Sequence, residues 1–265
     1  MRRLVFAIGL LFAATPAFAK MQAKPVEWSV GQERFSGYVV YDDAAKAKRP
    51  GLVMVPNWMG VTDDAVARAK AIAGDDYVVL VADVWGKGKQ PKDSAEAGKF
   101  AGALRGEDRG PLRARIEAAL ATLKAQAGKA PLDASKLGAF GFCFGGSTVL
   151  ELARSGADVA GVVSLHGGLA PGAKSQTAAS IKAPVLVLNG ADDKATPDAD
   201  ILAFEKEMDA ARADWQFVDF SGAVHCFAEP SAGNDPASNC RYDARAAKRA
   251  YRMMDDFFRE RFAAK

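Results

Sequence analysis

Short apolar runs alternate along the chain with longer segments that carry an apolar residue every three or four positions. The runs show no polar alternation, which is typical of strands buried on both faces of a parallel sheet. The longer segments have one apolar face, which is typical of helices that pack against such a sheet. The predicted strands are 51–55, 77–82, 136–142, 159–165, 184–188 and 215–220.

Start signals place helices between these strands. Thr62 is a typical N-cap in front of an apolar stripe, and Pro111 and Pro197 stand where two further helices are expected to begin. A last amphipathic helix is predicted over residues 243–262. Residues 93–109 are polar with little apolar stripe, so they predict a loop or a short helix over the sheet edge.

Residues 26–30 and 34–41 predict an antiparallel hairpin at the edge of the sheet. No internal repeat or linker divides the rest of the chain. We therefore expect one α/β domain over residues 20–265, with a mostly parallel sheet covered by helices on both faces. In such domains the functional side chains lie on loops beyond the carboxyl ends of the strands.

The first residues have the pattern of a secretory signal peptide. Arg2 and Arg3 form the charged start, residues 4–14 form the apolar stretch, and residues 17–19 form a small-residue cleavage signal. We expect residues 1–19 to be removed on export, which places the mature protein in the periplasm or outside the cell. A retained anchor is the alternative, but the apolar stretch is short for a bilayer. After cleavage no membrane contact is expected.

Charge narrows the range of partners. The formal net charge of the 265-residue chain is +3, and loss of the two arginines of the signal peptide lowers it to +1. No long basic run remains, so nucleic-acid binding has no electrostatic support. The expected partner is a small molecule, and the sequence leaves the oligomeric state open.

Export changes what the three cysteines imply. An oxidising compartment favours disulfides, and Cys226 and Cys240 enclose a short loop-like stretch that is easy to cross-link. Such a bond contributes on the order of 3 kcal/mol in the chain-entropy model. Cys143 is then the odd thiol. Three free thiols, or a Cys143–Cys226 pair that would block this thiol, are the alternatives.

The central motif is Gly141-x-Cys143-x-Gly145, which follows an apolar run and directly precedes a helix-compatible segment. This is the layout of a nucleophile elbow, a strained strand-to-helix turn that exposes its central side chain. The glycines are needed because a Cβ would clash where strand and helix pass close together. The helix N-terminus favours a thiolate and an oxyanion. Cys143 is therefore the candidate nucleophile, although a free cysteine is often a small buried apolar residue.

A cysteine nucleophile needs a base, and a third group that fixes the tautomer of the base. In elbow proteins the acid and then the histidine follow the nucleophile along the chain, which favours His225 as the base. His166 lies at a strand end before the acid loop and is expected to have a pocket-lining or capping role. Asp192 and Asp193, in the loop after the strand 184–188, both qualify as the acid by position.

An oxyanion needs two backbone N–H donors. Phe144, next after the nucleophile, supplies one by position, and Trp58, in the loop after the strand 51–55, is the candidate for the other. Trp58 and Trp85 are also candidates for the walls of the pocket. We expect no metal and no cofactor, because two histidines far apart in sequence form no ligand-spaced cluster.

These segments together resemble the dienelactone hydrolase family of α/β-hydrolases, which uses Cys in place of Ser. The matching pieces are 83–88, 141–146, 190–197 and 222–227. The resemblance implies an α/β-hydrolase fold, a triad of Cys143, Asp193 and His225, and hydrolysis of a small ester or lactone. Hydrolases of this architecture carry Gly-x-x-Asp with Pro four residues on, which favours Asp193 over Asp192.

The chain departs from the family's pattern at three positions. Well-known members have a Glu that contacts the thiol, and here the matching residue is Asn57, whose amide cannot accept that proton. We therefore expect His225 to ionise Cys143 directly. The family's two substrate-binding arginines fall at Lys87 and Glu229, and a carboxylate facing Glu229 would be repelled, which argues against dienelactone itself as substrate. The candidate substrate pocket comprises Asn57, Trp85, Lys87, His166 and Glu229.

The sequence thus predicts an exported hydrolase that cleaves a small ester or lactone through a thioester on Cys143. The alternative is a non-catalytic or redox-responsive periplasmic protein that binds a small ligand on the same scaffold. Ester turnover separates the two.

Overall fold

The computed structural model describes residues 21–107, 109–172 and 181–264, so the predicted signal peptide lies outside the described residues. The predicted apolar runs form strands, and most of them are buried on both faces. The strands are β1 (Met21–Val30), β2 (Glu33–Asp42), β3 (Arg49–Val55), β4 (Val78–Ala82), β5 (Leu132–Phe142), β6 (Val162–Leu165), β7 (Val185–Gly190) and β8 (Trp215–Phe220).

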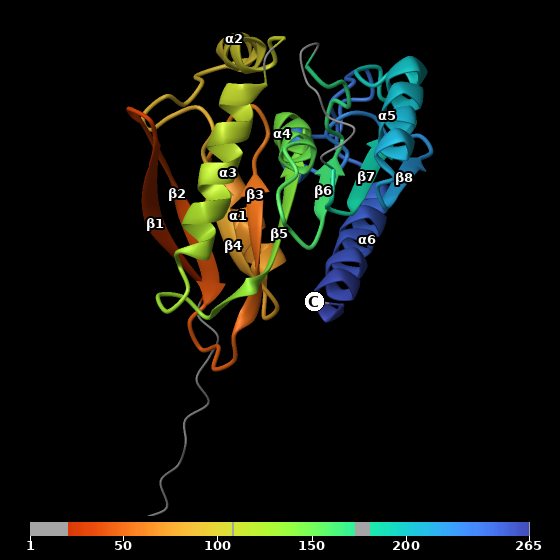
Figure 1. The fold of residues 1–265 in the computed structure, drawn as a ribbon. Helices are drawn as coiled ribbons and strands as arrows, with labels where there is room; N and C mark the ends of the chain where they lie inside the picture. The colour runs from red at the N-terminus through yellow and green to blue at the C-terminus, as the bar shows by residue number, and fades with distance from the viewer. Residues whose placement is uncertain (1–20, 108, 173–180, 265) are drawn as a thin grey trace, which may run out of the picture.

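The strands form one sheet in the order β1-β2-β4-β3-β5-β6-β7-β8 (Figure 1). β1 and β2 are the predicted antiparallel hairpin at one edge, and β2 is also antiparallel to β4. Every pair from β4 across to β8 is parallel. Because parallel strands end at the same edge, the loops after β3 to β8 meet there.

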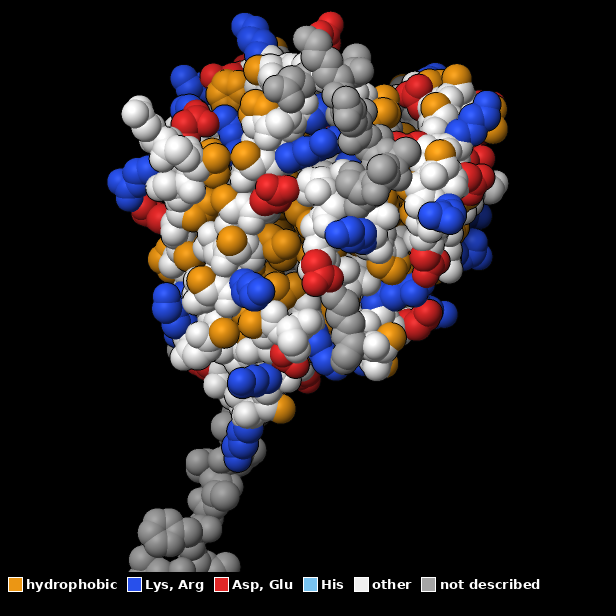
Figure 2. Space-filling model, in the orientation of Figure 1, with side chains coloured by type: hydrophobic (Ala, Val, Ile, Leu, Met, Phe, Trp, Pro, Cys, Tyr) orange, Lys and Arg blue, Asp and Glu red, His pale blue; other side chains and the backbone are white. Residues whose placement is uncertain are grey.

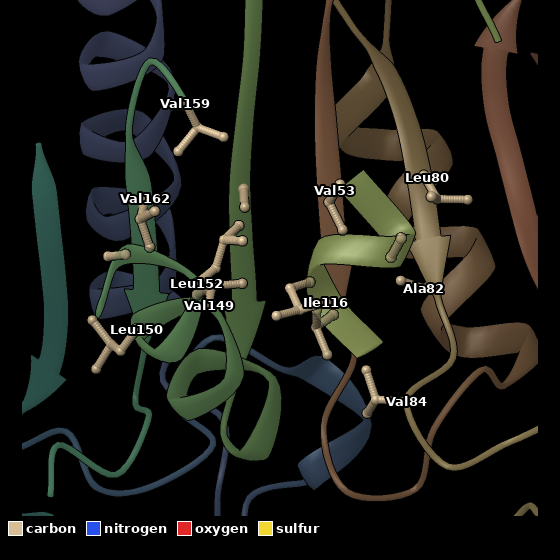
Figure 3. Packing of buried hydrophobic residues seen from close by; sticks show 14 of the residues in the cluster. Val53, Leu80, Ala82, Val84, Ile116, Val149, Leu150, Leu152, Val159 and Val162 are labelled. Carbon is tan, nitrogen blue, oxygen red and sulfur yellow. The ribbon is translucent and has the colours of Figure 1, made fainter. Parts of the chain in front are cut away.

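Helices cover both faces of the sheet. One apolar cluster joins the sheet to α1 and α6, and the other joins it to α3, α4 and α5. Figure 3 shows part of the second cluster, with Ile116 of α3 and Val149 of α4 among strand residues such as Val53. The helices are α1 (Asp63–Ala73), α2 (Ser94–Leu104), α3 (Gly110–Lys124), α4 (Phe144–Arg154), α5 (Asp198–Ala211) and α6 (Ala244–Ala263), with a 3₁₀ turn η1 (Pro230–Ala232).

The segment predicted as a loop or a short helix contains the full three-turn helix α2. Asp93 caps it by accepting the backbone N–H of Glu96. Its buried residues are Ala97 and Ala101. Alanines form a stripe of low hydrophobicity but have the highest helix propensity, so the apolar pattern alone understates this helix.

Within the described ranges, no helix combines the length and apolarity that a bilayer crossing requires. On the face seen in Figure 2, basic and acidic side chains are interspersed. That face therefore presents no basic stripe of the kind that follows a phosphate backbone.

Candidate active site

Cys143 stands between β5 and α4, at the turn that the sequence predicts. Its φ is 51°, a positive value that a non-glycine residue rarely adopts, that costs about 1–3 kcal/mol and that is typical of functional turns. A Cβ on Gly141 would overlap the backbone of Gly145, and a Cβ on Gly145 would overlap the carbonyl oxygens of Val55 and Pro56. The two glycines are what allow the elbow to pack closely against β3.

The Cys143 thiol is free and half-buried, and it contacts His225. Its Sγ lies 3.0 Å from His225 Nε2. The other ring nitrogen, Nδ1, lies 2.7 Å from Asp193 Oδ2. The structure therefore brings Cys143, His225 and Asp193 into one row, whereas Asp192 is exposed to solvent.

Hydrogen bonds fix the carboxylate of Asp193, which is buried. Its Oδ1 accepts the backbone N–H of Ala195 at 2.8 Å and the side-chain amide of Asn239 at 3.1 Å. Its Oδ2, which faces His225, also lies 3.5 Å from the hydroxyl of Thr196. Both carboxylate oxygens are thus engaged, and the acid has a single orientation toward the base.

These contacts decide the charges in the row. Burial alone would lower the pKa of His225, but the hydrogen bonds to Asp193 and Cys143 outweigh burial and raise the pKa from 6.5 to about 10. Burial would raise the pKa of Asp193, but the hydrogen bond and charge of His225, together with the hydrogen bonds from Ala195 and Asn239, outweigh burial, so this pKa lies below its ordinary value. The raised pKa of His225 favours an imidazolium at neutral pH.

The predicted oxyanion donors flank the elbow. The loop after β3 lies against α4 at Gly145, and Trp58 is half-buried in this loop. Asn57 Oδ1 accepts the backbone N–H of Met59 at 2.9 Å, which braces the turn around Trp58. Phe144 is the first residue of α4, where backbone N–H groups have no acceptor within the helix. The role of Trp58 and Phe144 in holding an oxyanion stays a prediction.

Comparison with known proteins tests the family resemblance that the sequence suggests. A model of the dienelactone hydrolase family matches residues 35–262. The chain belongs to the dienelactone hydrolase family. Membership confirms the α/β-hydrolase fold and makes the protein a hydrolase of the ester and lactone class.

Three similar proteins show how much of this chain is shared with known ones. The crystal structure of a dienelactone hydrolase-like promiscuous phosphotriesterase from metagenomic libraries is 37% identical, with a TM-score of 0.84 over 91% of this chain and 99% of that one. An uncharacterized protein of Caenorhabditis elegans, K02A2.1, is 36% identical over 58% of this chain and 96% of its own length. A putative carboxymethylenebutenolidase of Methylorubrum extorquens is 35% identical over 55% of this chain but 49% of its own length. The match thus spans about half of the Methylorubrum protein.

In this member of the dienelactone hydrolase family, the second histidine contacts the backbone of the nucleophile. His166 follows β6, is fully buried, and its Nδ1 accepts the backbone N–H of Cys143 at 3.2 Å. Burial, and then the charge of the nearby His225, hold the pKa of His166 well below its ordinary value. A neutral ring that accepts at Nδ1 carries its proton on Nε2, and this atom lies 3.8 Å from Glu229 Oε1.

Glu229 is buried and its charge is already engaged. Its Oε2 accepts from Asn57 Nδ2 at 2.6 Å and from the guanidinium of Arg68 at 2.7 Å. The sequence predicts a Glu229 that faces and repels the carboxylate of a substrate. This prediction is wrong, because the side chain is enclosed by Asn57 and Arg68, and it gives no reason to exclude an anionic substrate.

The remaining predicted pocket residues follow β4. Trp85 is buried, and its ring lies 4.5 Å from the ring of Phe144, so it packs against the start of the elbow helix. Lys87 Nζ lies 2.6 Å from Glu27 Oε1 in an exposed ion pair with β1. The structure thus brings Trp85 to the elbow and turns Lys87 toward the edge hairpin.

A disulfide joins Cys226 to Cys240, as the sequence predicts, and leaves Cys143 as the free thiol. Among the residues that the structure describes, no group of three or more His, Cys, Asp or Glu side chains is arranged to hold a metal ion. The absence of a metal and of a cofactor from the reaction stays a prediction of the sequence.

Sequence reasoning missed two residues of the site. Arg68 lies on α1, where a lone arginine is ordinarily read as exposed charge, and its ion pair reaches across 161 positions. Asn239 reaches Asp193 across 46 positions. One signal was available for Asn239, because its neighbour Cys240 is cross-linked to the residue directly after His225.

Proposed function

We propose that this protein is an exported hydrolase that cleaves a small carboxylic ester or lactone with Cys143 as nucleophile. The observation that carries the proposal is the row of contacts from Cys143 Sγ through His225 to Asp193, at 3.0 and 2.7 Å. A nucleophile that contacts a base, with the base fixed by a carboxylate, is the arrangement of an activated nucleophile. Family membership supports the ester and lactone class.

In the first half of the reaction, the Cys143 thiolate attacks the carbonyl carbon and forms a C–S bond. The charge that moves to the carbonyl oxygen is stabilised by the N–H groups of Phe144 and Trp58. The intermediate then collapses, the bond to the leaving oxygen breaks, and the proton on His225 Nε2 goes to that oxygen. The products are an alcohol and a thioester on Cys143; with a lactone, the alcohol stays attached to the acyl group.

In the second half, water removes the acyl group. Neutral His225 takes a proton from water while the water oxygen attacks the thioester carbonyl. The C–S bond breaks, the acid departs, and the Cys143 thiolate faces an imidazolium again. Asp193 keeps the other ring proton on Nδ1 throughout. Asn57 cannot accept a proton, so His225 alone moves protons at the sulfur.

Hydrolysis of p-nitrophenyl acetate by the protein of residues 20–265 tests the proposal. In Cys143→Ala we expect kcat/KM to fall at least about 1000-fold, because no nucleophile remains. Undiminished turnover in this variant would show that the elbow is not the site. No turnover in the wild type, with Cys143 shown to be reduced, would favour the ligand-binding or redox alternative.

Two neighbouring aspartates provide a matched control for the acid. Asp193→Asn is expected to lower kcat about 100-fold or more, because the amide no longer stabilises the imidazolium. Asp192→Asn is expected to change kcat less than about twofold, as is usual for a surface substitution. Equal losses in the two variants would contradict the assignment of Asp193.

Export is supported by the charged start, apolar stretch and cleavage signal within residues 1–19. The disulfide agrees with it, since such bonds persist in oxidising compartments. Expression of the full chain in a bacterium, followed by mass spectrometry of the periplasmic fraction, is expected to give a protein that begins at Lys20. An uncleaved chain confined to the cytoplasm would contradict export.

Phosphotriester hydrolysis is a second candidate activity. It is favoured by the 37% identity to a promiscuous phosphotriesterase. A p-nitrophenyl phosphotriester releases the same chromophore as the ester, so both activities can be followed in one assay. Release that disappears in Cys143→Ala would place both reactions at the same sulfur.

A further inference from the structure

One short segment contacts both the acid and the base of the proposed triad. It consists of Asn239, Cys240 and Arg241, and we call these three residues the clamp. The clamp lies between η1 and α6 and belongs to neither of the loops that carry Asp193 and His225. All the residues that make its contacts with the two loops lie in the part of the chain that the structure describes.

The acid side of the clamp is the amide of Asn239, which is half-buried. Its Nδ2 donates to Asp193 Oδ1 at 3.1 Å, and its Oδ1 accepts the backbone N–H of Lys194 at 3.1 Å. One side chain therefore holds both the carboxylate and the backbone just after it. A hydrogen bond to an ionised group is stronger than one between neutral groups, so the contact with Asp193 matters most.

The base side of the clamp is covalent. Cys240 is bonded to Cys226, the residue directly after His225, and it also forms a β-bridge with His225. The backbone N–H of Arg241 donates to the carbonyl oxygen of His225 at 3.1 Å. Cys226 has a φ of 62°, so the chain turns sharply just after the base. The clamp thus holds the chain at both residues of this turn, His225 and Cys226.

We propose that the clamp sets the alignment of Asp193 with His225, with Asn239 as a positioning residue whose own place is fixed by the Cys226–Cys240 disulfide. The proposal rests on the proposed function, in which this pair serves Cys143. Asn239 acts through Asp193. Cys240 is exposed and Cys226 is buried, so a thiol reductant approaches the disulfide from the Cys240 side. The activity therefore depends on a bond that takes no part in the reaction.

Two substitutions of Asn239 separate positioning from simple loop structure. Asn239→Ala removes the donor to Asp193, and we expect kcat to fall about 10-fold with KM within about twofold. Asn239→Asp keeps the acceptor for the Lys194 N–H but sets a second carboxylate against Asp193. We expect it to lose more, about 100-fold, and to shift the acid limb of the pH profile of kcat/KM upward, because a like charge raises the pKa of Asp193.

A role limited to loop structure would give the opposite order, with Asn239→Asp close to wild type and an unshifted pH profile. That result would overturn the proposal. Asn234→Ala, an exposed asparagine in the same loop, is the matched control and is expected to leave kcat unchanged within about twofold.

Reduction tests the link between the disulfide and Asn239. Dithiothreitol supplies two electrons and two protons, Cys226 and Cys240 become thiols, and the reagent closes to its own cyclic disulfide. Reduction of the wild type is expected to lower kcat about as much as Asn239→Ala does. In Asn239→Ala, reduction is expected to add less than about twofold, because the two changes disable one unit. Losses that multiply in full would show that the disulfide and Asn239 act separately.

Alkylation of Cys143 keeps this test independent of ester turnover. The rate of Cys143 labelling by iodoacetamide at pH 6, measured by mass spectrometry, reports the thiolate beside His225. We expect Asn239→Ala to slow labelling at least about fivefold relative to Asn234→Ala, because Asp193 is then no longer held in contact with His225 and stabilises the imidazolium less. If no ester is hydrolysed but labelling slows, the proposed function fails and the clamp stands. If esters are hydrolysed and labelling is unchanged, the clamp fails.

Discussion

The two histidines of this chain both contact Cys143, and their pKa values are shifted in opposite directions. Their rings are 5.2 Å apart. His225 contacts the sulfur of Cys143, and its pKa is raised to about 10. His166 contacts the backbone N–H of Cys143, and burial holds its pKa well below the ordinary value. The shifts favour a cationic His225 and a neutral His166 at neutral pH.

The presence of a nearby carboxylate does not explain the difference between the two pKa values, because each histidine has one. Asp193 Oδ2 meets His225 at hydrogen-bond distance, 2.7 Å. Glu229 Oε1 lies 3.8 Å from His166, and the other oxygen of this carboxylate is bonded to Arg68 and Asn57. A carboxylate stabilises an imidazolium here only where it is in direct contact and its charge is not already neutralised.

The largest expected effect comes from replacing each of the two histidines in turn. His225→Ala is expected to lower kcat/KM for p-nitrophenyl acetate at least about 1000-fold, because proton transfer at Cys143 is lost. His166→Asn is expected to lower it less than about 10-fold, since the amide oxygen replaces Nδ1 as acceptor and Asn tolerates the φ of 41°. Equal losses would mean that His166 also transfers protons.

The next effect is on stability and concerns Glu229. Glu229→Ala leaves Arg68 without its buried partner, and we expect the free energy of unfolding in urea to fall by about 3 kcal/mol. Glu27→Ala removes the partner of Lys87 in an exposed pair and is expected to change it by less than about 1 kcal/mol. Similar values for the two variants would show that the Glu229 pair is as weak as one in solvent.

The last effect is the pH dependence of stability, where the histidines act in opposite directions. The folded protein raises the pKa of His225 from 6.5 to about 10, so its contribution is complete below pH 6.5 and is lost as pH rises toward 10. The folded protein lowers the pKa of His166, so stability falls as pH drops below 6.5, where the unfolded chain gains a proton. Urea unfolding of His225→Gln beside wild type is expected to give a difference that shrinks between pH 7 and 10. A constant difference would contradict the raised pKa.

Most of the fold and the proposed triad could be predicted because their signals are local. Gly141 and Gly145 flank Cys143 for a steric reason that any sequence with this turn must satisfy. The strands are buried on both faces, so they appear as unbroken apolar runs. The order of nucleophile, acid and histidine then leaves His225 as the base.

The parts that were missed depend on contacts between distant positions. Nothing beside Glu229 in the sequence indicates that Arg68 neutralises it, because the two residues lie on separate elements. The burial of Glu229 follows from packing between separate elements, which the sequence does not show. For α2 the reason is different, since alanines such as Ala97 carry too little hydrophobicity to mark a buried face.

The close packing of Gly145 against the carbonyl oxygens of Val55 and Pro56 has a consequence for engineering. The loop after β3 leaves no room for a Cβ at Gly145 of the elbow helix, so the spacing between loop and helix cannot be tuned by substitution at this position. Variants selected for bulkier substrates should therefore accumulate changes in the surrounding loops and keep this glycine.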